Sequence, residues 1–278
     1  MNLLAFSTLA CPGWSIPTVI EKAAEFGYEA IEWRGGMQGH IPTTIPSQEL
    51  ASLRRMSRDA GLTALSITSY TSFVSPRAEE RKSNVDQLRC YCDLAAEIGA
   101  PYVRAFLGEL PGNTKLTDAM YENISSCLDV AAMYATTVGV KIAIEPHDDF
   151  TRSAIVSPLL ARDPSSDLRV IWDLGNTFAA GEEPLEGFRL LKDRLAYVQV
   201  KDGMFDELGW QLCPIGHGDV PLTQAFELLL GDGYEGAFSV EWEYAWHPEL
   251  DAPEIALPAA RWTIQKLLSV IQSETTGD

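Results

Sequence analysis

The feature that most constrains the fold is the regular alternation of short apolar segments with longer amphipathic ones. Apolar runs of strand length recur eight times, and each precedes a stretch in which apolar residues have helical spacing. Eight strand–helix units predict an α/β protein with a single (β/α)8 TIM barrel, a fold that often occupies about 250 residues. The expected strands are 3–7, 28–34, 63–70, 102–108, 141–147, 168–176, 196–201 and 237–244.

Helix ends are marked by glycine at several positions, such as Gly27 and Gly99, and glycine is a common C-terminal helix stop. A doubly wound open sheet is the alternative fold, but the chain has no glycine-rich dinucleotide fingerprint after its first strand. Because no linker or low-complexity segment divides the chain, we expect one domain over 1–272 and a frayed tail over 273–278. The expected helices are 16–26, 48–60, 78–98, 117–138, 153–162, 184–192, 221–231 and 252–271.

The charge balance excludes some classes of partner. Asp and Glu number 39 and Lys and Arg number 21, which gives a formal net charge of −18. Nucleic acids and anionic membranes are polyanions, so we expect neither as a partner. The chain begins without the cationic and apolar regions of a signal peptide, and its five cysteines show no repeated CxxC spacing. We therefore expect a cytoplasmic protein with reduced thiols that acts on a small molecule.

Side-chain parity separates polar from apolar positions in the last four predicted strands. Successive strand residues face opposite ways, so Ile142 and Ile144 share one face and Glu145 lies on the other. We expect the apolar faces to pack under the helices and the polar faces to point into the barrel, at the end where barrel active sites form. The polar residues that converge there are Glu145, Asp173, Gln199 and Glu241.

Three carboxylates crowded in a medium of low dielectric constant would repel one another unless they are compensated. A divalent cation is the simplest compensation. Shared protons with raised pKa values, or ion pairs with Lys201 and Arg104, are the alternatives. All four candidate ligands offer oxygen, which for Gln199 is the amide carbonyl. Oxygen ligands favour Mn²⁺ or Mg²⁺, with Co²⁺ as a further candidate, over a structural zinc ion.

At these positions the sequence resembles the sugar phosphate isomerase/epimerase superfamily, the xylose isomerase-like TIM barrels. The resemblance covers essentially the whole chain and implies one Mn²⁺-type ion held by the four converging residues. The strand-seven ligand is most often His in the superfamily, whereas Gln199 resembles the ligand of hydroxypyruvate isomerases. Asn176 and His217 also depart from the residues common there. The segments that carry the resemblance are 142–147 (IAIEPH), 172–176 (WDLGN), 197–202 (YVQVKD), 215–220 (IGHGDV) and 239–243 (SVEWE).

The resemblance also implies a reaction. These enzymes abstract a proton α to a carbonyl of a sugar or keto-sugar, with a metal-stabilised enediolate. Glu145 and Glu241 correspond to the paired acid/base groups of relatives. His147, two residues beyond Glu145 on the same strand face, is a second candidate base. Lys201 is a candidate for stabilising an oxyanion or for pairing with Glu241.

Five further residues are candidates for contact with substrate. His217 is expected in a loop, and Trp246 and Phe73 are expected in loops near strand ends, where aromatic rings commonly stack on sugars. Arg104 and Glu32 share the inward parity of their strands, and internal ion pairs are the alternative for both. We expect His247 in a loop or at the surface.

Several functions remain open at this point. The first is a metal-dependent isomerase or epimerase of unphosphorylated sugars. The second is the catalytic subunit of a C-glycoside deglycosidase, a lyase that cleaves 3-oxo-C-glycosides by β-elimination beside a small β-rich second subunit. A DNA-repair endonuclease needs many zinc-binding histidines, whereas this chain has four, and a catalytically silent binding barrel is the last alternative. We therefore expect a sugar or glycoside substrate and either a homo-oligomer or a complex with a small subunit.

Overall fold

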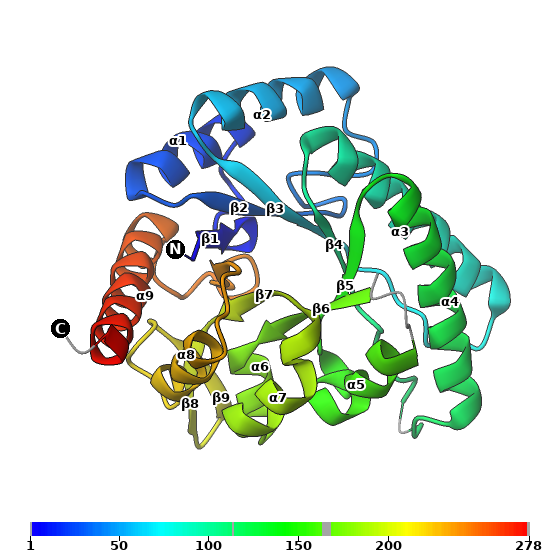
Figure 1. The fold of residues 1–278 in the computed structure, drawn as a ribbon. Helices are drawn as coiled ribbons and strands as arrows, with labels where there is room; N and C mark the ends of the chain where they lie inside the picture. The colour runs from blue at the N-terminus through cyan, green and yellow to red at the C-terminus, as the bar shows by residue number, and fades with distance from the viewer. Residues whose placement is uncertain (1, 113, 163–167, 277–278) are drawn as a thin grey trace.

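The computed structural model describes residues 2–112, 114–162 and 168–276. Eight parallel strands close into a barrel in the order β1-β10-β7-β6-β5-β4-β3-β2, with the helices around it (Figure 1). This arrangement confirms the predicted (β/α)8 barrel. The barrel strands are β1 (Leu4–Ser7), β2 (Ala30–Arg34), β3 (Thr63–Thr68), β4 (Tyr102–Ala105), β5 (Lys141–Ile144), β6 (Leu168–Asp173), β7 (Leu195–Val200) and β10 (Phe238–Val240).

The helices agree with the predicted ones to within a few residues at most ends. The helix α1 (Ile16–Phe26), for example, ends at Gly27, whose φ of 79° is the left-handed conformation that glycine adopts without strain. The other α-helices are α2 (Ser47–Asp59), α3 (Ala78–Ile98), α4 (Asp118–Thr137), α5 (Ser153–Arg162), α6 (Leu174–Ala179), α7 (Pro184–Leu191), α8 (Leu222–Gly231) and α9 (Pro253–Thr276). Single-turn helices are η1 (Thr8–Ala10), η2 (Asp148–Phe150) and η3 (Lys192–Arg194).

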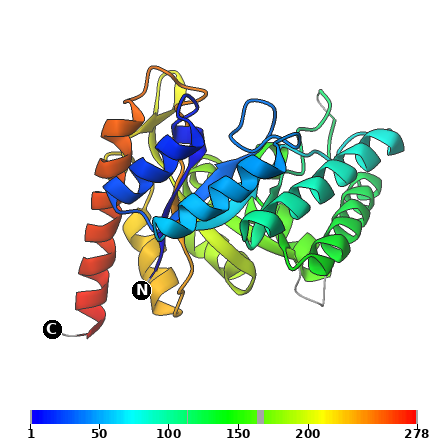
Figure 2. The same ribbon diagram turned by 90° about the horizontal axis from the view of Figure 1, so that it is seen from above.

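The last helix, α9, runs along the outside of the barrel and projects past its neighbours towards the C-terminus (Figure 2). It continues to Thr276, so residues 273–276 of the predicted tail extend this helix. Residues 277 and 278 lie outside the described residues, and the fraying of 273–278 stays a prediction. Within the described residues, no helix combines the length and the apolar character that crossing a lipid bilayer requires.

Two buried layers follow the predicted parity. Ile142 and Ile144 belong to the large core between the strands and the helices. Ala143, Ile171 and Tyr197 belong to a smaller cluster inside the barrel, in which five of the eight buried members are alanines. Small side chains fill the narrow interior there, and polar side chains take over the inward positions towards the carboxyl ends of the strands.

Several strand ends differ from the prediction. The strands β5 and β10 stop at Ile144 and Val240, so Glu145 and Glu241 directly follow them. The predicted strand 168–176 is wrong beyond Asp173, because α6 begins at the next residue. The Asp173 carboxylate accepts a hydrogen bond at 2.8 Å from the backbone N–H of the third residue after it, which starts a helix where strand parity suggested more strand.

A two-stranded antiparallel hairpin, β8 (Asp202–Asp206) and β9 (Gly209–Cys213), interrupts the barrel pattern after β7 and was not predicted. The Asp202 carboxylate accepts backbone hydrogen bonds from Gly216 at 2.8 Å, Gly218 at 3.0 Å and Val220 at 3.2 Å. A Cβ at Gly218 would collide with Asp202. The 215–220 motif is therefore held to the base of the hairpin by this carboxylate and by the backbone hydrogen bond from Asp219 N–H to the Gly203 carbonyl at 2.8 Å.

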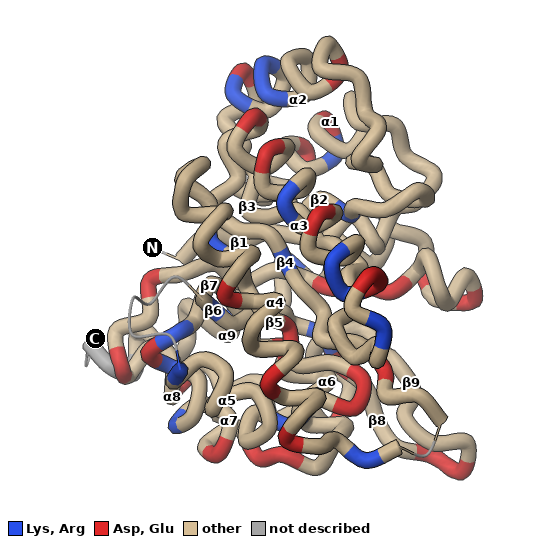
Figure 3. Tube along the Cα trace, turned by 90° about the vertical axis from the view of Figure 1, so that its right-hand side faces the viewer, with Lys and Arg blue, Asp and Glu red and all other residues tan. Residues whose placement is uncertain are grey.

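The excess negative charge is spread over the molecule. In Figure 3 acidic segments lie on several helices and at the tip of the β8–β9 hairpin, with Lys and Arg between them. The acidic residues that give the net charge are thus distributed over many elements and do not gather in one segment.

Candidate active site

Three carboxylates meet at the carboxyl ends of the barrel strands. Glu145 follows β5, Asp173 ends β6 and Glu241 follows β10, and all three side chains are buried. One carboxylate oxygen of each lies within 4.8 Å of one oxygen of the other two. Parallel strands of a closed barrel end on one rim, so residues 96 positions apart in the chain become neighbours.

Lys201, at the end of β7, lies among these carboxylates. Its Nζ atom is 3.1 Å from Asp173 Oδ2, 2.6 Å from Glu241 Oε2 and 2.5 Å from Glu243 Oε1. It also donates to Asn176 Oδ1 at 3.2 Å. Burial opposes the charged form of Lys201, but the surrounding carboxylates outweigh it and raise the pKa of the ammonium group. The ion pairing expected as an alternative to a metal is thus present.

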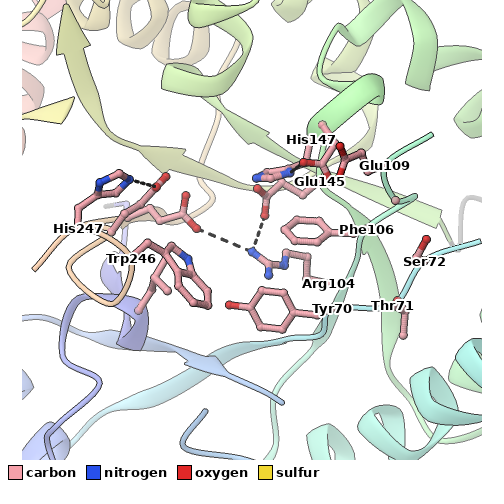
Figure 4. Close-up of a pocket in the computed structure, with 15 residues that line it drawn as sticks. Tyr70, Thr71, Ser72, Arg104, Phe106, Glu109, Glu145, His147, Trp246 and His247 are labelled. Atoms are coloured by element: carbon pink, nitrogen blue, oxygen red, sulfur yellow. Dashed lines mark hydrogen bonds and ion pairs between the residues drawn. The ribbon is translucent and has the colours of Figure 1, made fainter. Parts of the chain in front are cut away.

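Arg104, on β4, is the second buried cation of the site. Its Nη1 atom is 2.8 Å from Glu145 Oε2 and 3.8 Å from Glu241 Oε1. The guanidinium carbon lies 3.9 Å from the ring centre of Phe106 and 5.1 Å from that of Tyr70 (Figure 4). Ring faces attract a cation, so the two aromatic side chains support the buried charge in addition to Glu145.

The three carboxylates differ in how well they are compensated. Burial raises the pKa of Asp173 well above its usual value, and Lys201 opposes this only in part. Burial also raises the pKa of Glu145, against the opposing effect of Arg104. For Glu241 burial acts in the same direction, but Lys201 and Arg104 together hold its pKa at about 2. Negative charge is therefore most costly on Asp173 and Glu145.

The cationic side chains balance the carboxylates of the site only in part. Four carboxylates face two cationic side chains in this part of the described chain, and the buried Glu32 carboxylate lies on the other side of the Gln199 amide, so negative charge is in excess. The carboxylates are Glu145, Asp173, Glu241 and Glu243, and the cations are Arg104 and Lys201.

Gln199 supplies a fourth oxygen. Its Nε2 atom donates to Glu32 Oε1 at 2.8 Å and to Glu241 Oε1 at 3.1 Å. Its Oε1 atom is buried and accepts no hydrogen bond from the described residues. A buried amide oxygen without a donor is the ligand atom that the predicted metal site requires. Three carboxylates and one free amide oxygen fit a divalent cation that prefers oxygen ligands.

The comparisons with known proteins agree with this geometry. Residues 20–266 match the family described as xylose isomerase-like TIM barrel. The chain belongs to this family. Among curated proteins, this xylose isomerase-like barrel is similar to fructoselysine 3-epimerase of Escherichia coli O157:H7, with 23% identity over 234 residues that cover 79% of this chain and 82% of that protein.

Two solved structures share the xylose isomerase-like barrel at lower identity. The structure of L-ribulose 3-epimerase superposes with a TM-score of 0.82 at 16% identity, covering 99% of this chain and 97% of that one. The structure of the IOLI protein with a bound zinc atom has a TM-score of 0.81 at 17% identity, covering 97% and 99%. At this identity the likeness shows the fold.

A cavity of 520 Å³ opens at Glu145 and Glu241 of this xylose isomerase-like barrel, within the range of small-molecule sites, whereas Asp173 and Gln199 are not among its lining residues. Glu145, Glu241 and Arg104 line its inner part. The His147 ring stacks on Phe106, with centroids 4.4 Å apart and planes at 26°. Other lining residues, several of them visible in Figure 4, are Tyr70, Thr71, Ser72, Glu109, Glu243, Trp246 and His247.

The structure places the predicted substrate contacts in different regions. Arg104 and Trp246 line the cavity. The guanidinium carbon of Arg34 lies 4.4 Å from the centre of the Trp246 ring. His217 lines a separate groove beside α9. Phe73 is fully buried away from the cavity, and Glu32 is fully buried inside the barrel. Lys201 contacts the carboxylates but is not among the residues lining the cavity.

Several cavity residues were missed by the sequence analysis. Phe106 and Glu243 each lie two positions beyond a predicted site residue and share its strand face, so extending the parity by one step would have found them. Tyr70 lies two positions beyond Thr68, the last residue of β3, so the same extension of the strand parity applies to it. His247 was expected in a loop or at the surface. It is exposed in the loop after β10, and the course of this loop brings it to the cavity.

Proposed function

We propose that this xylose isomerase-like barrel is a divalent-metal-dependent isomerase or epimerase that abstracts a proton α to the carbonyl of a sugar or keto-sugar. The observation that carries the proposal is the buried Glu145–Asp173–Glu241 cluster with the free Gln199 oxygen beside it, next to a 520 Å³ cavity. The epimerase names of similar proteins support the substrate class.

One metal ion would be held by Glu145, Asp173, Gln199 and Glu241. We propose Mn²⁺, with Mg²⁺ and Co²⁺ as alternatives, because all four donors are oxygen atoms. The bound ion would act as a Lewis acid towards a substrate oxygen. On the protein side, Arg104 and Lys201 neutralise only part of the carboxylate charge, and a dication would compensate more of it.

For the proton transfer we propose Glu145 as the base and Glu241 as its acid/base partner, because both carboxylates line the cavity. His147 lines the same cavity and is partly exposed, so it can exchange a proton with a more distant substrate atom. Lys201 supports the reaction by keeping Asp173 and Glu241 compensated.

The cavity walls would orient the sugar. Trp246 and Arg104 both line the cavity, and Figure 4 shows the Phe106 ring between the His147 ring and the Arg104 guanidinium group. Ring faces can pack on the C–H surface of a sugar while charged groups bind its hydroxyls. We propose Arg104 and Trp246 as substrate contacts.

The test is exchange of the α-proton. The protein with Mn²⁺ is incubated in D₂O with a panel of keto-sugars, and NMR follows the loss of the α-proton signal and the appearance of isomers. Glu145→Gln keeps the shape but removes the base, so exchange should fall by about 10²–10⁴-fold. Equal exchange in Glu145→Gln, or in protein stripped of metal by EDTA, would refute the proposal.

Elimination is the second reaction that starts with the same proton abstraction. A 3-oxo-C-glycoside added to the panel would release its aglycone, which is detected by absorbance. Aglycone release without isomerisation of free keto-sugars would identify the protein as a lyase, the catalytic subunit of a C-glycoside deglycosidase, in place of an isomerase.

Size-exclusion chromatography tests whether the protein forms the predicted homo-oligomer, and the cytoplasmic location stays a prediction.

A further inference from the structure

Glu32 is a buried carboxylate that the proposed reaction does not use. It lies on β2 with no exposed surface, inside the barrel and outside the cavity lining. Its Oε1 atom accepts hydrogen bonds from Tyr197 Oη at 3.0 Å and Gln199 Nε2 at 2.8 Å, and its Oε2 atom accepts one from Ser239 Oγ at 2.6 Å. The donors belong to β7 and β10, which do not pair with β2, so Glu32 reaches across the barrel interior.

These hydrogen bonds determine which way the Gln199 amide faces. An amide group has one end that donates and one that only accepts. The donating end, Nε2, lies between the carboxylates of Glu32 and Glu241. Turning the amide over would place its oxygen against two carboxylate oxygens, and all three atoms are acceptors when the carboxylates are ionised. The oxygen is therefore held on the opposite side, where it accepts no hydrogen bond from the described residues.

We propose that Glu32 is a positioning residue that orients the Gln199 amide so that Oε1 is presented as a metal ligand. The inference rests on the metal site of the proposed function. The hydrogen bond to Glu241 alone does not give this orientation. Glu241 is itself a proposed metal ligand, so its hydrogen bond would draw Nε2 of Gln199, and not Oε1, towards the ion. Glu32 holds the nitrogen from the side away from the cavity. Groups that orient a ligand in this way commonly change metal affinity by about 10–100-fold.

Two substitutions separate orientation from charge. Glu32→Gln removes the negative charge but keeps an oxygen that can accept from Gln199 Nε2, whereas Glu32→Met removes both. Titration calorimetry with Mn²⁺ should show a dissociation constant about tenfold higher for Glu32→Met than for Glu32→Gln. Ser239→Ala removes a different hydrogen bond of Glu32 and serves as the matched control, for which we expect a change below about twofold, since the Glu32–Gln199 contact is kept.

A second background makes the test specific. In Gln199→Glu the ligand has an oxygen on both sides and needs no orientation. Glu32→Met and Glu32→Gln should then differ by less than about twofold in that background, because the effect of the lost charge is common to both. The same tenfold difference in both backgrounds would overturn the inference, since it would then reflect packing. Circular dichroism checks that each variant is folded.

A readout without metal distinguishes this inference from the proposed function. In protein labelled with ¹⁵N-glutamine, the side-chain amide signal that disappears in Gln199→Glu belongs to Gln199. Its protons should exchange slowly with water in the unchanged protein and in Glu32→Gln, and faster in Glu32→Met. Slow exchange in all three overturns the orientation by Glu32. If the amide behaves as expected but the unchanged protein binds no Mn²⁺, the proposed function fails and Glu32 still orients the amide.

Discussion

Replacing Lys201 with Met should destabilise the metal-free protein and make its stability more dependent on a divalent ion. The Lys201 ammonium group touches Asp173 and Glu241, whose side chains are almost fully buried, at 3.1 Å and 2.6 Å. Methionine has a similar length but no charge. In Lys201→Met the two carboxylates keep their burial and lose their nearest cation.

The magnitude follows from the burial of the partners. Removing one member of a buried ion pair costs about 3–5 kcal/mol, because the remaining charge is left uncompensated. Mn²⁺ should restore part of the lost stability. Lys201→Met lacks the ammonium group that repels the metal ion in the unchanged protein, so the variant should bind the ion more tightly. Two unit charges about 4 Å apart interact by about 4 kcal/mol at an effective dielectric constant of 20, so an affinity gain of at least tenfold, about 1.4 kcal/mol, is a conservative expectation.

The assay is urea unfolding followed by circular dichroism, in EDTA and at one fixed Mn²⁺ concentration. The free energy of unfolding of Lys201→Met should be lower than that of the unchanged protein by about 3–5 kcal/mol in EDTA, and the difference should shrink by about 1.4 kcal/mol or more in Mn²⁺. The control is Lys192→Met, whose pair with Asp232 at 2.7 Å is solvent-exposed, so that the substitution should change stability little and equally in both buffers. An equal loss for Lys201→Met in EDTA and in Mn²⁺ would refute the reasoning.

Three further predictions concern stability away from the carboxylates. Burial raises the pKa of Glu182 in the folded protein above the usual 4.5. The contribution of Glu182 to stability is therefore present at low pH and is lost as the pH rises from 4.5 through the pKa of the folded protein. Glu182→Gln should weaken this pH dependence of the melting temperature. Asp202→Asn removes acceptor capacity for the backbone N–H groups of the 215–220 motif and should lower the free energy of unfolding in urea by about 1–3 kcal/mol. Tyr28→Phe removes the hydrogen bond at 2.7 Å to the Leu257 carbonyl of α9 and should cost about 0.5–1.5 kcal/mol in the same assay.

The strand pattern predicted more than the fold. Alternation along single strands assigned Ile142 to the outer core and Glu145 to the interior, and the structure has both there. Because all strands of a parallel barrel end on one rim, the same parity brought Asp173 and Glu241 next to Glu145 before any distance was known. Local alternation was sufficient for these predictions, because whether a side chain faces inward or outward depends on its position along its own strand.

Residues in loops and contacts across the barrel were harder to predict. His217 and Phe73 carry the right side chains for sugar contact but lie away from the cavity, whereas His247 lies at it. A loop places its side chains through its own turns and its packing on neighbours, and no periodicity in the sequence records that path. The β8–β9 hairpin was missed for the same reason.

The sequence by itself determined the barrel, the inward face of each strand and the oxygen-rich character of its rim, because these depend on local periodicity and residue type. Only the tertiary structure decided that Arg104 pairs with Glu145, that Lys201 pairs with Asp173, and that Glu32 bonds to the Gln199 amide from across the barrel. Such pairings depend on distances of about 3 Å between atoms on strands far apart in the chain, which exist only once the sheet has closed.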